Sequence, residues 1–152
     1  MPKRGELVLA AGRTWLRTPF HWEASLKGVG ADCKGLLGGA ARECGFPEGN
    51  TMEAVLVGYA RHIDEAKLLA GLDRLFDRVP CDLGQAEPGD VLAFRIRDRV
   101  QHLGLYGGDG TRHTVLHAYS GNPSMVLEMP LERMWTKRLA GVWRWRELGG
   151  GD

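Results

Sequence analysis

The sequence predicts an α+β fold with an antiparallel sheet. Apolar residues recur at helical spacing in the first half of the 152-residue chain, whereas the second half carries short runs with the composition of strands. Helices that precede the strands, rather than alternate with them, are typical of α+β domains. The length suits one domain, and no repeat or linker interrupts the sequence. We therefore expect residues 1–152 to form a single domain, with the N-terminal helices packed on a C-terminal sheet.

Four segments of the first half have the apolar periodicity of helices. The second of them is marked most clearly, because Asp32 stands at its N-cap position and Gly45-Phe46-Pro47 follows its end. Pro19 prevents the first from continuing, and Pro80 follows the fourth. The segment from Phe20 to Gly30 is predicted to be a loop. The expected helices cover residues 6–15, 33–44, a segment that opens at 51, and 68–76.

The pattern changes to strands after the turn sequence Glu87-Pro88-Gly89-Asp90. Loops rich in Gly, Asp and Asn separate the first runs, which favours hairpins and an antiparallel sheet. Trp143 and Trp145 share one face of the last run, and we interpret them as sheet packing rather than as a carbohydrate-stacking platform. The expected strands cover residues 91–96, 101–106, 111–119, 125–129 and 138–146, with a connector over 131–136.

The composition excludes several classes of function. Lys and Arg total 20 against 19 Asp and Glu, so the net charge of +1 argues against nucleic acid as a partner. No apolar run approaches the ~20 residues of a membrane span. The apolar stretch 7–11 is shorter than the core of a secretory signal, so synthesis in the cytoplasm is expected.

Three cysteines without a CxxC pair predict neither a disulfide framework nor a structural zinc site. His113 and His117 would suit zinc on a helix, but the β-branched Thr114 and Val115 between them favour a strand, on which i and i+4 lie ~13 Å apart. We therefore expect no metal and no cofactor.

Cys33 is the candidate nucleophile. It opens the second predicted helix, where free backbone N–H groups and the positive end of the helix dipole favour a thiolate and a developing oxyanion. Lys34 adds positive charge beside it. The alternative, a packed and inert thiol, remains open. Cys44 and Cys81 lack this setting.

A thiolate enzyme needs a base, and the chain has five histidines, His21, His62, His102, His113 and His117. His102 shares a strand face with Gly104, and we expect open space before it because glycine has no side chain. His113 and His117 share a face of the next predicted strand, so either one could orient the ring of His102. His62, near a helix end, is interpreted as complementing the helix dipole.

Four blocks of the sequence resemble, in order, the NlpC-type cell-wall cysteine peptidases. The family blocks read roughly Asp-Cys-Ser-Gly-Leu, Pro-Gly-Asp-Leu, His-Val-Gly-Ile-Tyr and Ile-His-Ala. The corresponding blocks here are Asp32-Cys33-Lys34-Gly35-Leu36-Leu37, Glu87-Pro88-Gly89-Asp90-Val91, Gln101-His102-Leu103-Gly104-Leu105-Tyr106-Gly107-Gly108 and Leu116-His117-Ala118. Upstream, Phe20-His21-Trp22 is similar to the family's Tyr-x-Trp-Gly-Gly segment.

The resemblance implies a papain-like fold with Cys33 as the nucleophile, His102 as the general base and acid, and His117 in the orienting position. His113 stays the second candidate for that position, because 15 positions separate His102 from His117, slightly more than we expect for the family. Asp32 matches a position that helps to bind the free amine of the substrate in some members.

The predicted substrate-binding residues are Phe20, Trp22, Asp32 and Lys34. The sequence departs from the family pattern at three places, two of them at Phe20 and Lys34. Lys34 replaces a serine, and its ammonium would repel a substrate amine. Phe20 replaces a tyrosine and lacks the hydroxyl that would hydrogen-bond the substrate or the oxyanion. His21 is the alternative donor for that hydrogen bond. Glu23-Ala24 replaces a Gly-Gly pair and alters the pocket wall.

The function implied is a cysteine endopeptidase that cleaves stem peptides of peptidoglycan. The short chain and the expected lack of a signal peptide resemble the phage-tail and gene-transfer-agent branch, which implies assembly on a phage-like particle, action at the cell wall of a target cell, and tail-tip or hub proteins as partners. Two alternatives stay open. One is a thiol acyltransferase or amidase on the same scaffold, and the other is a structural tail protein with a decayed site.

Overall fold

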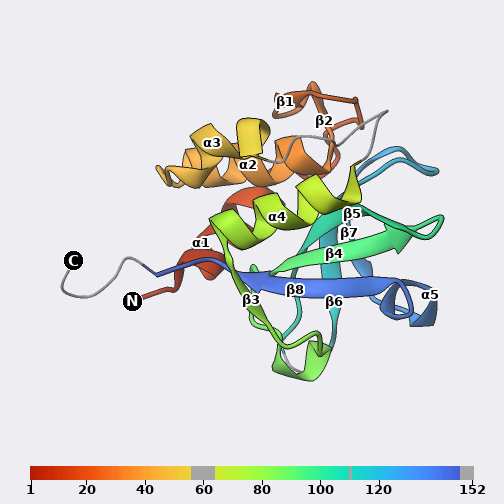
Figure 1. Ribbon diagram of the computed structural model, residues 1–152. Coiled ribbons are helices and arrows are strands. Elements are labelled where there is room, and N and C mark those ends of the chain that lie inside the picture. Colours follow the sequence, from red (N-terminus) through yellow and green to blue (C-terminus); the bar gives the residue numbers. More distant parts are fainter. Residues whose placement is uncertain (56–63, 110, 148–152) are drawn as a thin grey trace.

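The computed structural model describes residues 1–55, 64–109 and 111–147 of the chain (Figure 1). Four helices precede the main sheet, and a short helix, α5 (Arg133–Thr136), interrupts it. The four are α1 (Arg4–Arg13), α2 (Cys33–Glu43), α3 (Glu48–Val55) and α4 (Glu65–Leu75). The strands are β1 (Ser25–Leu26), β2 (Gly30–Ala31), β3 (Asp77–Val79), β4 (Val91–Ile96), β5 (Arg99–Tyr106), β6 (Thr114–Tyr119), β7 (Met125–Pro130) and β8 (Leu139–Arg144).

Six strands form one antiparallel sheet in the order β3-β8-β4-β5-β6-β7. In Figure 1, helices α2, α3 and α4 lie on one side of this sheet and α5 lies on the other. The strands β1 and β2 make a separate small hairpin before α2. The prediction of an α+β fold with helices packed on an antiparallel sheet is therefore confirmed.

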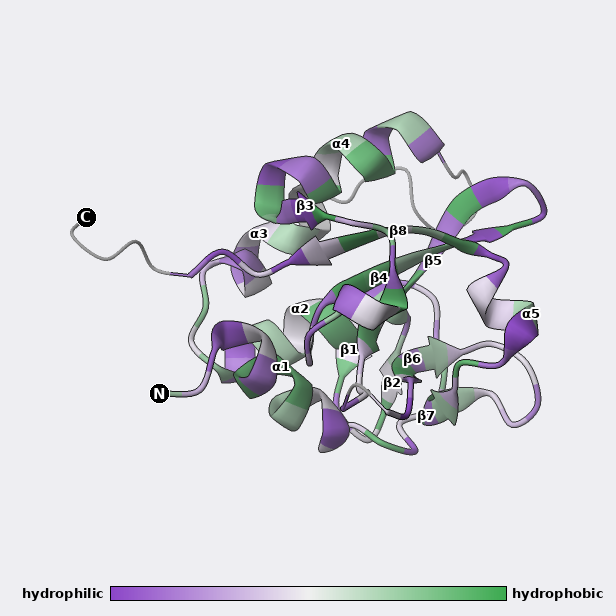
Figure 2. Ribbon diagram, turned by 90° about the horizontal axis from the view of Figure 1, so that it is seen from below, coloured by the Kyte–Doolittle hydropathy of each residue, from purple (hydrophilic) through white to green (hydrophobic). Residues whose placement is uncertain are grey.

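Alternation along the strands gives the sheet two buried faces. One face packs against the helices, with Leu103 and Leu105 of β5 against Leu36 and Leu37 of α2 in a common core. The other face carries a smaller core that Trp135 of α5 covers. The middle strands β4, β5 and β8 are largely green in Figure 2, whereas the helices alternate between green and purple, as one-sided burial requires.

The sequence located most elements within a few residues, and the differences have local causes. The expected strand over 111–119 begins only at Thr114, because the Asp109 carboxylate accepts hydrogen bonds from the backbone N–H groups of Thr111 and Arg112 and holds them in a turn. The helix expected from Thr51 begins at Glu48, and its predicted face at Leu56 and Tyr59 lies outside the described residues, as does His62.

The remaining differences are short elements. The connector expected over 131–136 contains α5, and the short strands β1, β2 and β3 were not predicted. Trp143 and Trp145 are buried in the core that faces the helices, which confirms their interpretation as packing residues.

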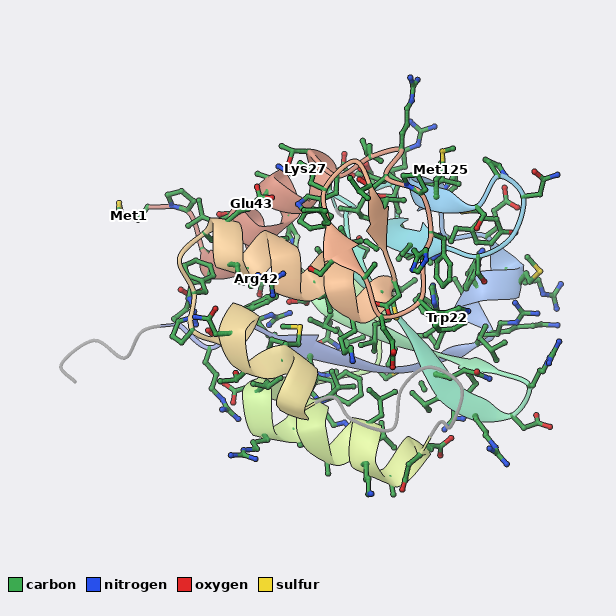
Figure 3. All side chains as sticks on the ribbon, turned by 90° about the horizontal axis from the view of Figure 1, so that it is seen from above. Met1, Trp22, Lys27, Arg42, Glu43 and Met125 are labelled. Carbon is green, nitrogen blue, oxygen red and sulfur yellow. The ribbon has the colours of Figure 1, made fainter. Side chains whose placement is uncertain are left out.

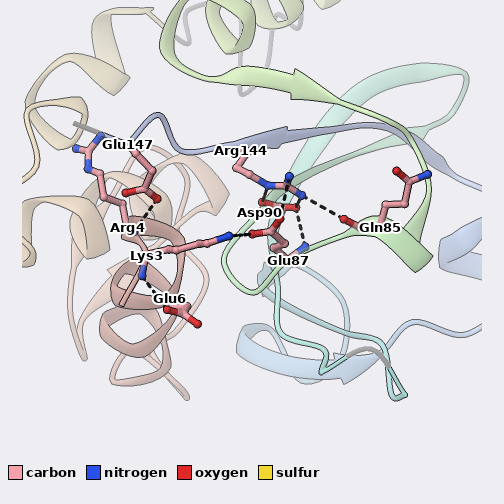
Figure 4. A network of polar contacts seen from close by, with 8 residues as sticks. All are labelled: Lys3, Arg4, Glu6, Gln85, Glu87, Asp90, Arg144 and Glu147. Atoms are coloured by element: carbon pink, nitrogen blue, oxygen red, sulfur yellow. Dashed lines mark hydrogen bonds and ion pairs between the residues drawn. The ribbon is translucent and has the colours of Figure 1, made fainter. Parts of the chain in front are cut away.

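The turn over 87–90 is confirmed, and an ion-pair network fixes it (Figure 4). The Arg144 guanidinium donates to both oxygens of the buried Asp90 carboxylate, at 3.0 and 2.8 Å. Glu87 pairs with Arg144 at 3.0 Å and with Lys3 at 2.7 Å. The network joins the N-terminal segment, the turn and β8, so the start of β4 is held in register.

Among the described residues, no helix has both the length and the apolar character needed to cross a membrane.

Candidate active site

A pocket of about 300 Å³ opens where three parts of the chain meet. Phe20 and Trp22 contribute from the segment before β1, Arg97 from the turn between β4 and β5, and His102 from β5. Its other lining residues are Ile96, Gln101 and Ser120. The pocket therefore brings together three of the residues that the sequence predicts for the site, namely Phe20, Trp22 and His102.

The aromatic wall of this pocket is attached to the residues directly before Cys33. His21 donates its backbone N–H to the carbonyl of Ala31 at 3.1 Å, and Ala31 donates to the carbonyl of Pro19 at 3.0 Å. The backbone N–H of Glu23 donates to Asp32 Oδ2 at 2.7 Å. These bonds make the segment over 19–24 and the start of α2 one unit, so the pocket wall is joined to the residue that precedes Cys33.

Asp32 forms the N-cap of α2, as the sequence predicts. Its Oδ1 accepts from the backbone N–H of Gly35 at 2.7 Å, while Oδ2 accepts from Glu23. The side chain is fully buried, and burial raises its pKa against the opposing effect of these bonds. The carboxylate therefore holds the loop to the helix and does not line the pocket. Its expected contact with a substrate amine stays a prediction.

Cys33 is the first residue of α2, where the sequence places it, and it is fully buried in the core beside Ala31 and Leu36. Gly35 lies shortly after it in the first turn, and a Cβ at this position would collide with the carbonyl oxygen of Ala24. Glycine is therefore required for the close approach of the 19–24 segment to α2. Lys34 is half-buried beside the cysteine, and its role in binding stays a prediction.

His102 and His117 contact each other across β5 and β6. Nε2 of His102 lies 2.6 Å from Nδ1 of His117, which is fully buried. This is the contact expected of a base and its orienting partner. His113 instead lies 2.5 Å through Nδ1 from the Tyr106 hydroxyl, so it is not the partner of His102. The ring of His21 lies 3.0 Å through Nδ1 from the Trp22 carbonyl oxygen.

The expectation of open space over Gly104 is wrong. A Cβ there would lie 2.5 Å from Val115 Cγ2 and 3.2 Å from His117 Cβ, so side chains of β6 fill the space. The pairs Leu105–Leu116 and Tyr106–Val115 set the register of the two strands. The missing side chain of Gly104 thus admits His117 from the neighbouring strand and brings it within reach of His102.

Aromatic rings enclose the histidine pair. Trp135 packs on both imidazoles, with ring centroids 5.7 Å from His102 and 5.1 Å from His117, and Phe94 lies 5.9 Å from His102. Burial lowers the pKa of His117. Burial also lowers the pKa of His102, and the electrostatic effect of the neighbouring His117 lowers it further. Both imidazoles are therefore neutral at pH 7. Sequence reasoning missed Trp135, because it lies in a segment interpreted as a connector.

Two further features shape the rim of the pocket. The rings of Phe20 and Trp22 meet edge to face at 5.0 Å, and Trp22 is 44% exposed at the end of the molecule away from Met1 (Figure 3). Arg97 and Asp98 both have positive φ, as a two-residue hairpin turn requires. This turn holds the exposed Arg97 at the pocket, where it adds positive charge.

In the described ranges, no three side chains of His, Cys, Asp or Glu are grouped as a metal ion would need. His113 and His117 in particular serve different partners, Tyr106 and His102.

Comparison with solved structures shows the same fold. The chain superimposes on NlpC1 from Trichomonas vaginalis with a TM-score of 0.66 and 20% identity, over 95% of this chain and 45% of that one. It superimposes on an N-acetylmuramoyl-L-alanine amidase from Bacteroides uniformis with a TM-score of 0.67 and 14% identity, over 94% of this chain and 99% of the amidase chain. It superimposes on the NlpC/p60 domain of the peptidoglycan hydrolase SagA with a TM-score of 0.60 and 15% identity, over 93% of this chain and 98% of that domain. The chain thus spans less than half of the Trichomonas protein and nearly all of the other two chains.

No curated protein matches the sequence. The sequence model of the NlpC/P60 family, by contrast, matches residues 17–144, which include Cys33, His102 and His117. This match covers most of the chain and agrees with the fold. The chain therefore belongs to the NlpC/P60 family.

Proposed function

We propose that this protein is a cysteine hydrolase that cleaves an amide bond in the stem peptides of peptidoglycan. The observation that carries the proposal is the His102–His117 contact beside a pocket whose wall is bonded to the residue preceding Cys33. Membership of the NlpC/P60 family supports it, as does the likeness to the fold of a peptidoglycan hydrolase and of an amidase.

In the proposed cycle, His102 takes the proton of the Cys33 thiol and the thiolate attacks the amide carbonyl carbon. Backbone N–H groups at the start of α2 stabilise the oxyanion. The C–N bond then breaks, and the imidazolium of His102 gives its proton to the leaving amine. Water, deprotonated by His102, hydrolyses the thioester, which yields a carboxylate and restores the thiol.

The charges at the pocket suit an anionic peptide. Arg97 at the rim forms no hydrogen bond or ion pair with another described residue. A γ-linked glutamyl residue keeps a free α-carboxylate, which a guanidinium binds well. We therefore propose that the bond cleaved lies in the γ-D-glutamyl part of the stem peptide, so that the enzyme is an endopeptidase.

The test is digestion of purified cell wall, followed by mass spectrometry of the fragments. Wild-type protein is expected to release fragments with new amino termini inside the stem peptide, and Cys33→Ala is expected to release none while melting at nearly the same temperature. Cys44→Ala, at a half-buried cysteine outside the pocket, is the matched control and keeps full activity. Undiminished cleavage by Cys33→Ala would refute the proposal.

A cut at the sugar–peptide junction is the second candidate, and the likeness to the Bacteroides amidase over 99% of its length favours it. The same digest separates the two. Freed lactyl-sugar ends identify an amidase, and new termini within the peptide identify an endopeptidase.

The complete burial of Cys33 favours a third candidate, a structural protein with an inactive site. The rate of alkylation by iodoacetamide at pH 7 distinguishes it, because an activated thiolate reacts faster than a free-thiol model and a sealed thiol reacts more slowly. Rapid alkylation of Cys33, lost in His102→Ala, supports the enzyme.

We propose further that the protein acts at the cell wall of a target cell as part of a phage-like tail, with tail-tip or hub proteins as partners. This proposal rests on the sequence resemblance to the phage-tail and gene-transfer-agent branch. Mass spectrometry of purified particles tests it. Detection of the chain in particles at a fixed ratio to tail proteins supports the proposal, and its absence from intact particles contradicts it.

A further inference from the structure

The second nitrogen of His117 faces a methionine. Nε2 of His117 lies 3.1 Å from Sδ of Met129, on the neighbouring strand β7. The pairing of His117 with Leu127 and of Val115 with Met129 places the methionine diagonally opposite, on the same sheet face. The ring nitrogen is within hydrogen-bonding distance of the thioether, whose sulfur is a weak acceptor, so we interpret the contact as a hydrogen bond to sulfur.

The direction of this bond follows from its chemistry. A thioether has no hydrogen, so it can only accept, and Nε2 of His117 must carry the proton. A neutral imidazole has one N–H, so Nδ1 of His117 is bare. That nitrogen then accepts from Nε2–H of His102, 2.6 Å away. Nδ1 of His102 is left without a proton, which is the state that a general base requires.

We propose that Met129 is a positioning residue whose sulfur fixes the tautomers of His117 and, through it, of His102. The base function of His102 rests on the proposed function, but the tautomers themselves do not. Without the sulfur, His117 is free to carry its proton on Nδ1. It then donates to His102, whose own proton moves to Nδ1 and blocks the base.

The tautomers are measured directly by NMR of the imidazole nitrogens in protein labelled with ¹⁵N-histidine, at pH 7. In the wild type, both Nε2 atoms are expected to be protonated and both Nδ1 atoms bare. Met129→Leu conserves volume and removes the acceptor. We expect this variant to show a mixture of the two tautomers for both histidines. Met125→Leu, four residues away on the same strand and paired with Tyr119, is the matched control and keeps the wild-type spectrum.

A second readout is activity on cell-wall fragments. Met129→Leu is expected to lower kcat about fivefold, the effect of one neutral hydrogen bond, with KM nearly unchanged. A proton on Nδ1 of His102 in the wild type, or a Met129→Leu spectrum identical to that of the wild type, would overturn the proposal. Wild-type tautomers in a protein that cleaves no cell wall would instead refute the proposed function and leave the role of Met129 standing.

Discussion

Replacing His117 by leucine removes the hydrogen-bond partner of His102 while keeping a side chain of moderate bulk. The two nitrogens lie 2.6 Å apart and His117 is fully buried, so the Nε2–H of His102 is left without its acceptor. An unsatisfied buried polar group costs about 1–3 kcal/mol. For a chain of this size that lowers the melting temperature by roughly 2–4 °C for each kcal/mol.

The effect on catalysis is larger than the effect on stability. A base that is no longer held in position or in the correct tautomer loses most of its contribution, which is about 10²–10⁴ in rate. His117→Leu is therefore expected to lower kcat by that factor. His117→Asn is expected to retain much more activity, because its amide oxygen replaces Nδ1 as an acceptor. His113→Leu is the matched control, since His113 contacts Tyr106 and not His102.

The assay is release of fragments from purified cell wall, with thermal melts of the same preparations. Equal kcat values for His117→Leu and the wild type, or an equal loss in His113→Leu, would refute the assignment of His117 as the orienting partner. A loss that His117→Asn shares in full would show that the effect is one of packing rather than of hydrogen bonding.

Three other predictions follow from the contacts. Gly35→Ala is expected to destabilise the fold by about 3 kcal/mol in chemical denaturation, because its Cβ meets the Ala24 carbonyl, and a loss below 1 kcal/mol would contradict this close approach. Arg97→Gln is expected to raise KM for carboxylate-bearing fragments up to about fivefold with kcat unchanged, an effect that salt should reduce and that amidated fragments should not show. The hydrogen-bonded Arg13 guanidinium holds the pKa of Glu128 in the folded protein below its ordinary value. The ion pair therefore stabilises the fold by under about 1 kcal/mol at any pH above the pKa of Glu128 in the unfolded chain. This contribution is lost as the pH falls through the lower pKa of Glu128 in the folded protein. Melts of Glu128→Gln and the wild type should differ at pH 7 and converge in acid, and a difference that persists at pH 2 would contradict the ion pair.

Local signals in the sequence determined the order of the elements and the start of the helix that carries the candidate nucleophile. The cap at Asp32 is a local effect, because its carboxylate bonds a backbone N–H only three residues away. The main-sheet strands after the turn at 87–90 were marked by their strand-like composition and by the loops between them, which depend on local residues, whereas β3 carried no such signal. The family blocks, likewise, are short runs of sequence, and each can be identified from its own residues. They are sufficient to point to Cys33, His102 and His117.

Strand register decided what those residues touch. Whether His113 or His117 meets His102 depends on the pairing of Tyr106 with Val115, and no local pattern encodes that pairing. The register of β5 and β6 also fills the space over Gly104. The register of β6 and β7 places Met129 against His117. Contacts between strands distant in sequence are set by the packing of the whole sheet. The sequence alone therefore identified the candidate thiol and imidazole side chains. Only the tertiary structure decided which of the described side chains are neighbours and how deeply each is buried.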